Sequence, residues 1–283
     1  MPAQLFTFVQ MEFPWELGPA DGRYLLRKTD GLDGNEPQHV VVLGTVGAER
    51  RGLLGGRSRM RRADPEPARV PVARATVVDP VPLSTDDQAR AWLSQLDPER
   101  ETLTATRVVN RVLFAHRVAA ATPHVHEVSP AQALVVRAGY GEGEQVADGL
   151  WRDARELLLS RRRSRRRASV LRPQERLAVL LSGRGRVLLC EELTLRARLD
   201  LDAGRLALAA IELERAYATA LKELPREERA DLQTRVEELR ELSAGVAKTA
   251  LAEEPDRQTV THALERLEAA LRARTASGFS SPN

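Results

Sequence analysis

Two groups of arginines and one pair of histidines are the residues of this 283-residue chain whose types and spacing suit chemistry. The first group is interleaved with glycines, and the second follows Ser160 directly. The members are Arg50, Arg51, Arg57, Arg59, Arg61 and Arg62, and then Arg161, Arg162, Arg163, Arg165, Arg166 and Arg167. A guanidinium carries parallel N–H donors that match a phosphate, and clustered arginines form the positive surface that DNA or RNA requires. Nucleic-acid binding through these arginines is therefore one hypothesis.

The same arginines also fit solvated connections, and we favour that interpretation for the second group. All but three of the 43 basic residues are arginine, the exceptions being Lys28, Lys222 and Lys248, so arginine richness alone indicates genome composition. Blocks of like charge are commonly solvated linkers, and the second group separates two halves with clear apolar patterns. The first group lies in a long predicted loop, a setting typical of functional and of disordered segments alike.

His124 and His126 form the histidine pair, whose spacing suits metal binding. Residues two apart on an extended segment point to the same side, as two ligands of one metal often must. No third ligand lies near them in the sequence, and Pro123 and Pro130 bracket the segment. A polar loop is therefore favoured over a metal site, and we expect no cofactor.

The remaining constellations do not point to catalysis. The one cysteine, Cys190, follows the apolar run 187–189, which predicts a buried and unreactive thiol. The glycine-rich segment 139–143 comes between a predicted strand and a predicted helix, as in a phosphate loop. However, Glu142 and Glu144 would repel a phosphate, so we interpret this segment as a turn. An enzyme of unrecognised type, with a pocket near the histidine pair, is the third hypothesis.

Period-two patterns predict an antiparallel sheet in the first part of the chain. Apolar residues alternate with Gln10 and Glu12 over 5–13, which indicates a strand with one buried face. The segment 18–22 contains glycines and a proline and predicts a turn, which joins this strand to 23–27 as a hairpin.

Further elements are predicted after this hairpin. Strands are expected over 39–46 and 70–78, the second at a sheet edge because Pro71 cannot donate to a hydrogen-bond ladder. The other predicted elements of this part are helices over 84–96, 98–122 and 145–158, and a strand over 133–137.

Apolar residues spaced alternately by four and three predict helices throughout the second part. From Leu199 to Leu224 this spacing indicates one continuous helix with a single apolar face, which Pro225 ends. Further helices are predicted after Pro173, Pro225 and Pro255. No stretch keeps the spacing over many heptads, so the pattern favours a compact bundle over a coiled coil.

One pair of predicted helices resembles a helical hairpin of the tetratricopeptide family over about thirty residues. The residues that carry the resemblance are Leu193, Ala197, Gly204, Ala209, Leu213 and Ala216. The resemblance implies two helices that cross at small residues, with a glycine at the turn. The aromatic residue expected near Asp200 and the proline expected near Leu221 are absent, and such repeats stabilise one another in stacks. A generic helix pair is therefore the favoured interpretation.

Together these patterns predict an α+β fold, in which a small antiparallel sheet with helices is followed by an all-α helical bundle. The predicted organisation is an α+β domain over 1–158, a basic linker over 159–172, a helical domain over 173–275 and a tail over 276–283. There is no apolar run long enough to span a membrane and no signal-peptide pattern, so we expect a cytoplasmic protein without a membrane partner.

The leading functional hypothesis is a cytoplasmic, non-catalytic interaction protein, an adaptor or scaffold. Its C-terminal helices would present a groove to a protein partner or to a second copy of the chain. The alternative is a nucleic-acid-associated protein that binds DNA or RNA through the two arginine groups, and the enzyme described above ranks third.

Overall fold

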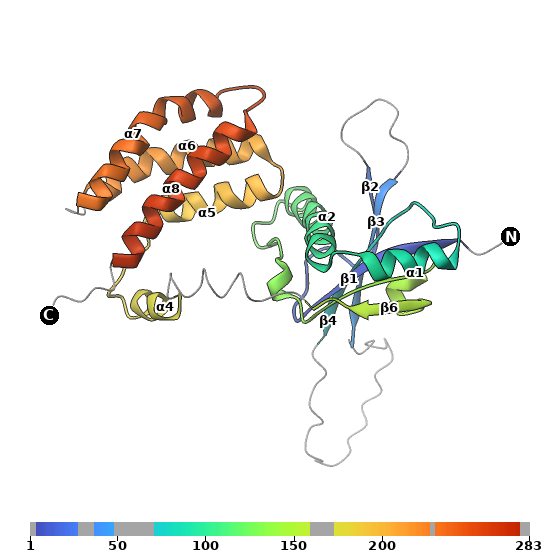
Figure 1. The fold of residues 1–283 in the computed structure, drawn as a ribbon. Coiled ribbons are helices and arrows are strands. Elements are labelled where there is room, and N and C mark those ends of the chain that lie inside the picture. The colour runs from blue at the N-terminus through green and yellow to red at the C-terminus, as the bar shows by residue number, and fades with distance from the viewer. Residues whose placement is uncertain (1–3, 28–36, 48–70, 159–172, 227–229, 278–283) are drawn as a thin grey trace, which may run out of the picture. The chain divides into compact units, whose positions relative to one another are not determined.

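The computed structural model describes residues 4–27, 37–47, 71–158, 173–226 and 230–277. The chain divides into two compact units, which we call the sheet unit (Met1–Ser160) and the helical unit (Arg161–Asn283). Figure 1 shows strands and two long helices in the sheet unit and helices alone in the helical unit. The predicted α+β class, with a sheet followed by an all-helical part, is confirmed.

The described residues of the sheet unit form a six-stranded antiparallel sheet with the order β2-β3-β4-β1-β5-β6. The strands are β1 (Leu5–Phe13), β2 (Gly22–Arg27), β3 (Pro37–Val46), β4 (Val72–Val78), β5 (Val135–Glu142) and β6 (Asp153–Glu156). β1 occupies an inner position between β4 and β5, and β2 and β6 are the edges.

The predicted hairpin between β1 and β2 is wrong, because β1 pairs with β4 and β5 while β2 pairs with β3. The physical reason is burial. Nearly every residue of β1 is buried on one face of the sheet or the other, which suits an inner strand, whereas in β2 Leu26 alone is buried. The segment that follows β1 therefore leads away to the far edge of the sheet.

The predicted edge position of the strand after Pro71 is also wrong. β4 begins at Val72, one residue past the proline, and lies between β3 and β1. Since Pro71 stands outside the ladder, every residue of β4 keeps its backbone N–H, and the proline does not conflict with an inner strand.

Two helices, α1 (Asp86–Gln95) and α2 (Pro98–Ala119), follow β4 as predicted. The hydroxyl of Thr85 caps α1 by accepting from Gln88 N, and the carboxylate of Asp97 caps α2. Their apolar faces share one core with one face of the sheet. The core includes Met11 and Phe13 of β1, Val41 of β3, Ala75 of β4, Leu93 of α1, and Val109 and Leu113 of α2.

The helix predicted over 145–158 is wrong, as is the turn predicted over 139–143. β5 continues through these glycines to Glu142, and the short 3-10 helix η2 (Gly143–Asp148) and β6 follow it. A Cβ atom on Gly139 would lie 2.8 Å from Cζ of Phe8, and one on Gly141 would lie 2.7 Å from Cγ1 of Val146. These glycines therefore allow η2 and β6 to approach β5 closely.

The helical unit contains α4 (Pro173–Leu181), α5 (Leu189–Asp202), α6 (Leu206–Glu223), α7 (Ala230–Ala250) and α8 (Arg257–Ser277) in its described part. The single helix predicted from Leu199 to Leu224 is in fact two, because α5 ends at Asp202 and α6 begins at Leu206. Gly204 has a φ of 80° and makes the turn between them. Because the apolar spacing continues across this turn, the spacing alone did not indicate a break between the two helices. The predicted helical hairpin with a glycine at its turn is present.

The core of the helical unit forms around α6. Ala209, Ala216 and Ala220 are fully buried and allow the neighbouring helices to approach closely. Tyr217 is buried as well, and its hydroxyl donates to the carbonyl of Ala263 at 2.8 Å, which joins α6 to α8. The short 3-10 helix η3 (Leu224–Arg226) follows α6, and its buried residue Leu224 is the last of the apolar residues on this side.

We predict that Leu213→Asp lowers the free energy of unfolding of the helical unit by about 3–5 kcal/mol, because the variant places a carboxylate in a packed apolar core. The matched control is Leu208→Asp, the same change on the exposed side of the same helix, which should cost less than about 1 kcal/mol. Urea denaturation followed by circular dichroism measures both. Equal losses at the two positions would contradict the assignment of the buried face of α6.

Candidate functional site

A cluster of polar side chains lies on the sheet face opposite α1 and α2. Gln10 and Glu12 of β1 alternate with the core residues Val9, Met11 and Phe13, so their side chains project from the other face. The neighbours across the strands are Thr76 and Arg74 in β4 and Arg137 in β5. Directly paired residues share a face, so the register of three strands brings these five polar residues together.

Glu12 is the centre of this cluster. Its Oε1 atom accepts from Nε and Nη2 of Arg74 at 3.2 and 3.0 Å, and from Nη1 of Arg137 at 2.8 Å. Burial raises the pKa of Glu12, but the hydrogen bonds and positive charges of Arg137 and Arg74 together hold that pKa below its ordinary value. Glu12 is therefore ionised at neutral pH, and two guanidiniums against one carboxylate leave an excess of one positive charge.

Gln10 and Thr76 form the fully buried base of the cluster. The Gln10 amide donates to Oγ1 of Thr76 at 2.9 Å and to the carbonyl of Ala147, in η2, at 3.3 Å. Its Oε1 atom accepts from Nη1 of Arg137 at 3.0 Å, and Nη1 of Arg74 donates to the same Ala147 carbonyl. These bonds fix η2 to the sheet and satisfy polar groups that would otherwise be costly to bury.

Aromatic rings flank the cluster. The rings of Phe8 and Trp151 are stacked with centroids 5.6 Å apart and planes at 30°. The guanidinium carbon of Arg137 lies 5.9 Å from the centroid of Trp151, within the range of a cation–π interaction. Arg137 is thus held by a ring as well as by Gln10 and Glu12.

A second feature of interest is the exposed apolar surface of the hairpin α5–α6. On α5, Leu195 is 67% exposed and Leu199 is 44% exposed, and the two lie one helical turn apart. On α6, Leu208 and Ile211 are 41% and 40% exposed. We call these four residues the hairpin patch. The opposite sides of both helices are buried in the core, so the patch is not part of the packing of the helical unit.

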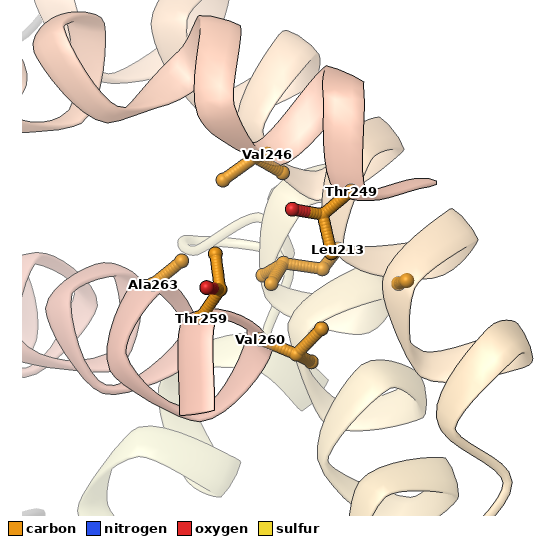
Figure 2. A pocket seen from close by; sticks show the side chains of 7 residues that line it. Leu213, Val246, Thr249, Thr259, Val260 and Ala263 are labelled. Carbon is orange, nitrogen blue, oxygen red and sulfur yellow. The ribbon is translucent and has the colours of Figure 1, made fainter. Parts of the chain in front are cut away.

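An apolar cleft also lies among α6, α7 and α8, as Figure 2 shows, with Leu213, Val246 and Val260 converging from the three helices. Its complete lining is Ala210, Leu213, Val246, Thr249, Thr259, Val260 and Ala263. The open space there is about 160 Å³ in all, and none of it would hold a water molecule. We interpret the cleft as a seam of the core, and it is too narrow for a ligand.

The structure does not place the two arginine groups predicted to bind nucleic acid. Arg50 to Arg62 and Arg161 to Arg167 all lie outside the described residues. His124 and His126 are described, and both are exposed between α2 and the short 3-10 helix η1 (Pro130–Gln132). No cluster of three or more His, Cys, Asp or Glu side chains suited to a metal occurs in the described ranges, so the structure brings no third ligand to this pair.

Cys190 is fully buried at the first turn of α5, and burial raises the pKa of its thiol well above the ordinary value. A hydrogen bond to the Glu223 carboxylate, whose two oxygens also accept from the backbone N–H groups of Leu189 and Cys190, acts in the same direction. The prediction of an unreactive thiol agrees with this setting.

The comparisons with known proteins add no assignment, because no protein-family model, no curated protein and no solved structure matches the chain. Among the helices that the structure describes, none is long and apolar enough to cross a membrane.

Sequence reasoning missed the polar cluster. It treated Gln10 and Glu12 as the solvent face of a strand, whereas Gln10 is fully buried and Glu12 is largely so. The available signal was the alternation of polar residues in two predicted strands, together with Arg137 at the end of a third. The strand register that unites Glu12 with Arg74 and Arg137 is a long-range property that no local pattern encodes.

We predict that Glu12→Gln lowers the free energy of unfolding at neutral pH by about 1–3 kcal/mol, because two guanidiniums lose their shared carboxylate. The folded-state pKa of Glu12 lies below its reference value of 4.5, so this stabilisation is complete above about pH 4.5 and is lost as the pH falls through the lower folded-state value. The difference between wild type and Glu12→Gln should therefore shrink in acid. Denaturation curves measured from neutral pH to about pH 3 check this.

The matched control is Glu144→Gln, which removes a carboxylate from an exposed ion pair with Arg23. Exposed pairs contribute little, so this change should cost less than about 1 kcal/mol. A Glu12→Gln variant as stable as Glu144→Gln would show that the cluster does not stabilise the sheet unit.

Proposed function

We propose that this chain is a cytoplasmic, non-catalytic interaction protein, an adaptor or scaffold whose C-terminal helices bind a protein partner or a second copy of the chain. The hairpin patch is the observation that carries the proposal. Leu195 and Leu199 are exposed one helical turn apart on α5, and Leu208 and Ile211 are exposed on α6. Exposed apolar surface that the core does not use is typical of protein–protein contact sites.

The character of the surrounding residues supports this proposal. Glu192 and Arg196 form an exposed ion pair one turn apart on α5, so polar residues border the apolar strip as they border the centre of many interfaces. The thiol of Cys190 is buried, and the cleft among α6, α7 and α8 is too narrow to hold a water molecule, so neither offers a site for a ligand.

Nucleic-acid binding is the second candidate, and one topological observation favours it. Val46 and Val72 pair at the end of the ladder between β3 and β4, so the described residues on either side of positions 48–70 lie at the same end of the sheet. That segment carries the first arginine group. Arg74 lies two residues after Val72, so the positively charged cluster around Glu12 is near the same end of the sheet.

We predict that the double variant Leu195→Ser, Leu199→Ser binds its partner at least about tenfold more weakly than wild type, since each exposed leucine contributes on the order of 1–2 kcal/mol when an interface buries it. Light scattering after size exclusion tests self-association. Affinity capture from native lysate, with and without nuclease, tests a protein partner. The control is Leu251→Ser, which removes a still more exposed leucine just after α7 and should change neither readout.

An unchanged assembly state together with an unchanged set of captured proteins would rule out the hairpin patch as the binding surface. Capture that disappears on nuclease treatment would instead favour the nucleic-acid candidate.

For that second candidate, we predict a steep salt dependence of DNA binding. If the six arginines of 161–167 each neutralise one phosphate of B-DNA, the slope of log affinity against log salt concentration should be about −5. Replacing all six with serine should flatten the slope and weaken binding to every sequence equally, because phosphate contacts carry no base information. Titrations by fluorescence anisotropy at several salt concentrations measure this, and absence of binding even at low salt would exclude the candidate.

A further inference from the structure

Arg74 and Arg137 share the Glu12 carboxylate but use their donors differently. Arg74 donates from all three of its side-chain nitrogens, to Glu12 from Nε and Nη2 and to the carbonyl of Ala147 from Nη1. Arg137 donates from Nη1 alone, to Gln10 and Glu12. Within the described part of the chain, no residue accepts from its Nε or Nη2, and the Arg137 side chain as a whole is 24% exposed.

The geometry of a guanidinium makes this difference significant. Nε and Nη2 lie along one edge of the planar group, and their N–H bonds on that edge are parallel. Such a fork matches two oxygens of a carboxylate or a phosphate and binds them with two charge-assisted hydrogen bonds. In Arg137 this edge is available, because the group is anchored through Nη1.

We propose that the Nε–Nη2 edge of Arg137 is a binding site for an oxyanion, the carboxylate or phosphate group of a ligand. This site lies in the sheet unit and is independent of the function proposed for the helical unit. Its occupant is defined by chemistry, namely a group that carries negative charge on two oxygens about as far apart as the two donors.

The site is held rigid before a ligand arrives. Nη1 of Arg137 is fixed by Gln10 and Glu12, and its guanidinium lies over the ring of Trp151. Gln10 is fully buried and is in turn fixed by Thr76. An arginine that is already ordered loses little side-chain entropy on binding, so more of the interaction energy appears as affinity.

The charge balance of the three ion-paired residues also favours an anion. Arg74 and Arg137 carry two positive charges against the single negative charge of Glu12. The side chain of Arg137 is 24% exposed, which leaves it accessible to a small ligand. Both guanidiniums are partly withdrawn from water, so the excess charge is screened less than it would be on an open surface.

Glu156 is the natural competitor for this edge. It is the partner of Arg137 in the ladder between β5 and β6, so its exposed side chain lies on the same face of the sheet. The structure shows no ion pair between the two in the described residues. The negative charge of Glu156 nonetheless lowers the local potential, and we expect it to weaken the binding of any other anion.

The experiment is an NMR titration of the full chain with inorganic phosphate and, separately, with acetate, at ionic strength held constant with chloride. The reporters are the Nε–H signal of Arg137 and the indole N–H signal of Trp151. We expect saturable shifts of both signals. Arg137→Lys keeps the charge but lacks the fork and should weaken binding by about tenfold, whereas Glu156→Gln should strengthen it several-fold.

The matched control is Arg23→Lys, which alters an exposed arginine that already pairs with Glu144 and should leave binding unchanged. The two probes distinguish the classes of ligand, because saturation by phosphate alone assigns a phosphate group and saturation by acetate alone assigns a carboxylate. Non-saturable shifts with both probes would overturn the proposal. So would equal affinities in wild type and Glu156→Gln, a comparison that does not depend on how well Arg137→Lys folds.

Discussion

The interaction on which the sheet unit depends is the sharing of one carboxylate, that of Glu12, by two guanidiniums from the strands on either side. β1 is buried on both faces, and one of those faces carries Gln10 and Glu12 beside the apolar Phe8. A charge that is largely withdrawn from water must be paired, so the presence of Glu12 in β1 requires cations at the adjoining positions of β4 and β5. A slip of either strand by one residue would move Arg74 or Arg137 to the opposite face and leave the carboxylate unpaired. The cluster therefore specifies the register of β4 and β5 relative to β1 as well as contributing to stability.

Two glycines of β5 allow η2 to pack over this cluster. Gly139 and Gly141 occupy positions of β5 at which a Cβ atom would collide with Phe8 and with Val146. Without side chains at these positions, η2 approaches closely enough for the carbonyl of Ala147 to accept from both Gln10 and Arg74. The glycines of β5 thus serve packing. Their role explains why a strand continues through a segment whose composition is typical of a turn, and why the following residues turn back as β6 and do not continue as a helix.

The sequence was sufficient for features that depend on local periodicity, namely the α+β class, the strand β1, the helices α1 and α2 and the helical character of the second unit. It was insufficient where a contact between distant residues decides the structure. The pairing of β2 with β3, the inner position of β4 and the burial of Gln10 are of this kind, and each depends on strand order. β6 carried no strand signal because three of its four residues are charged and exposed. The break between α5 and α6 was concealed because the apolar spacing continues through the turn at Gly204.

The role of an arginine in this chain is indicated by the hydrogen bonds of its individual nitrogen atoms and not by the residue type alone. In a chain whose basic residues are nearly all arginine, the identity of the residue at 74 or at 137 says little about its role. The two differ in what their nitrogens contact: Arg74 has every nitrogen engaged by protein acceptors, whereas Arg137 is anchored by one nitrogen and presents the opposite edge. A lysine in place of Arg74 could neutralise Glu12 but could not also reach Ala147 from a fixed fork, and a lysine in place of Arg137 would have no second edge to present. Both positions therefore require the planar group, one to join η2 to the sheet and the other to keep a pair of donors that the described residues do not use.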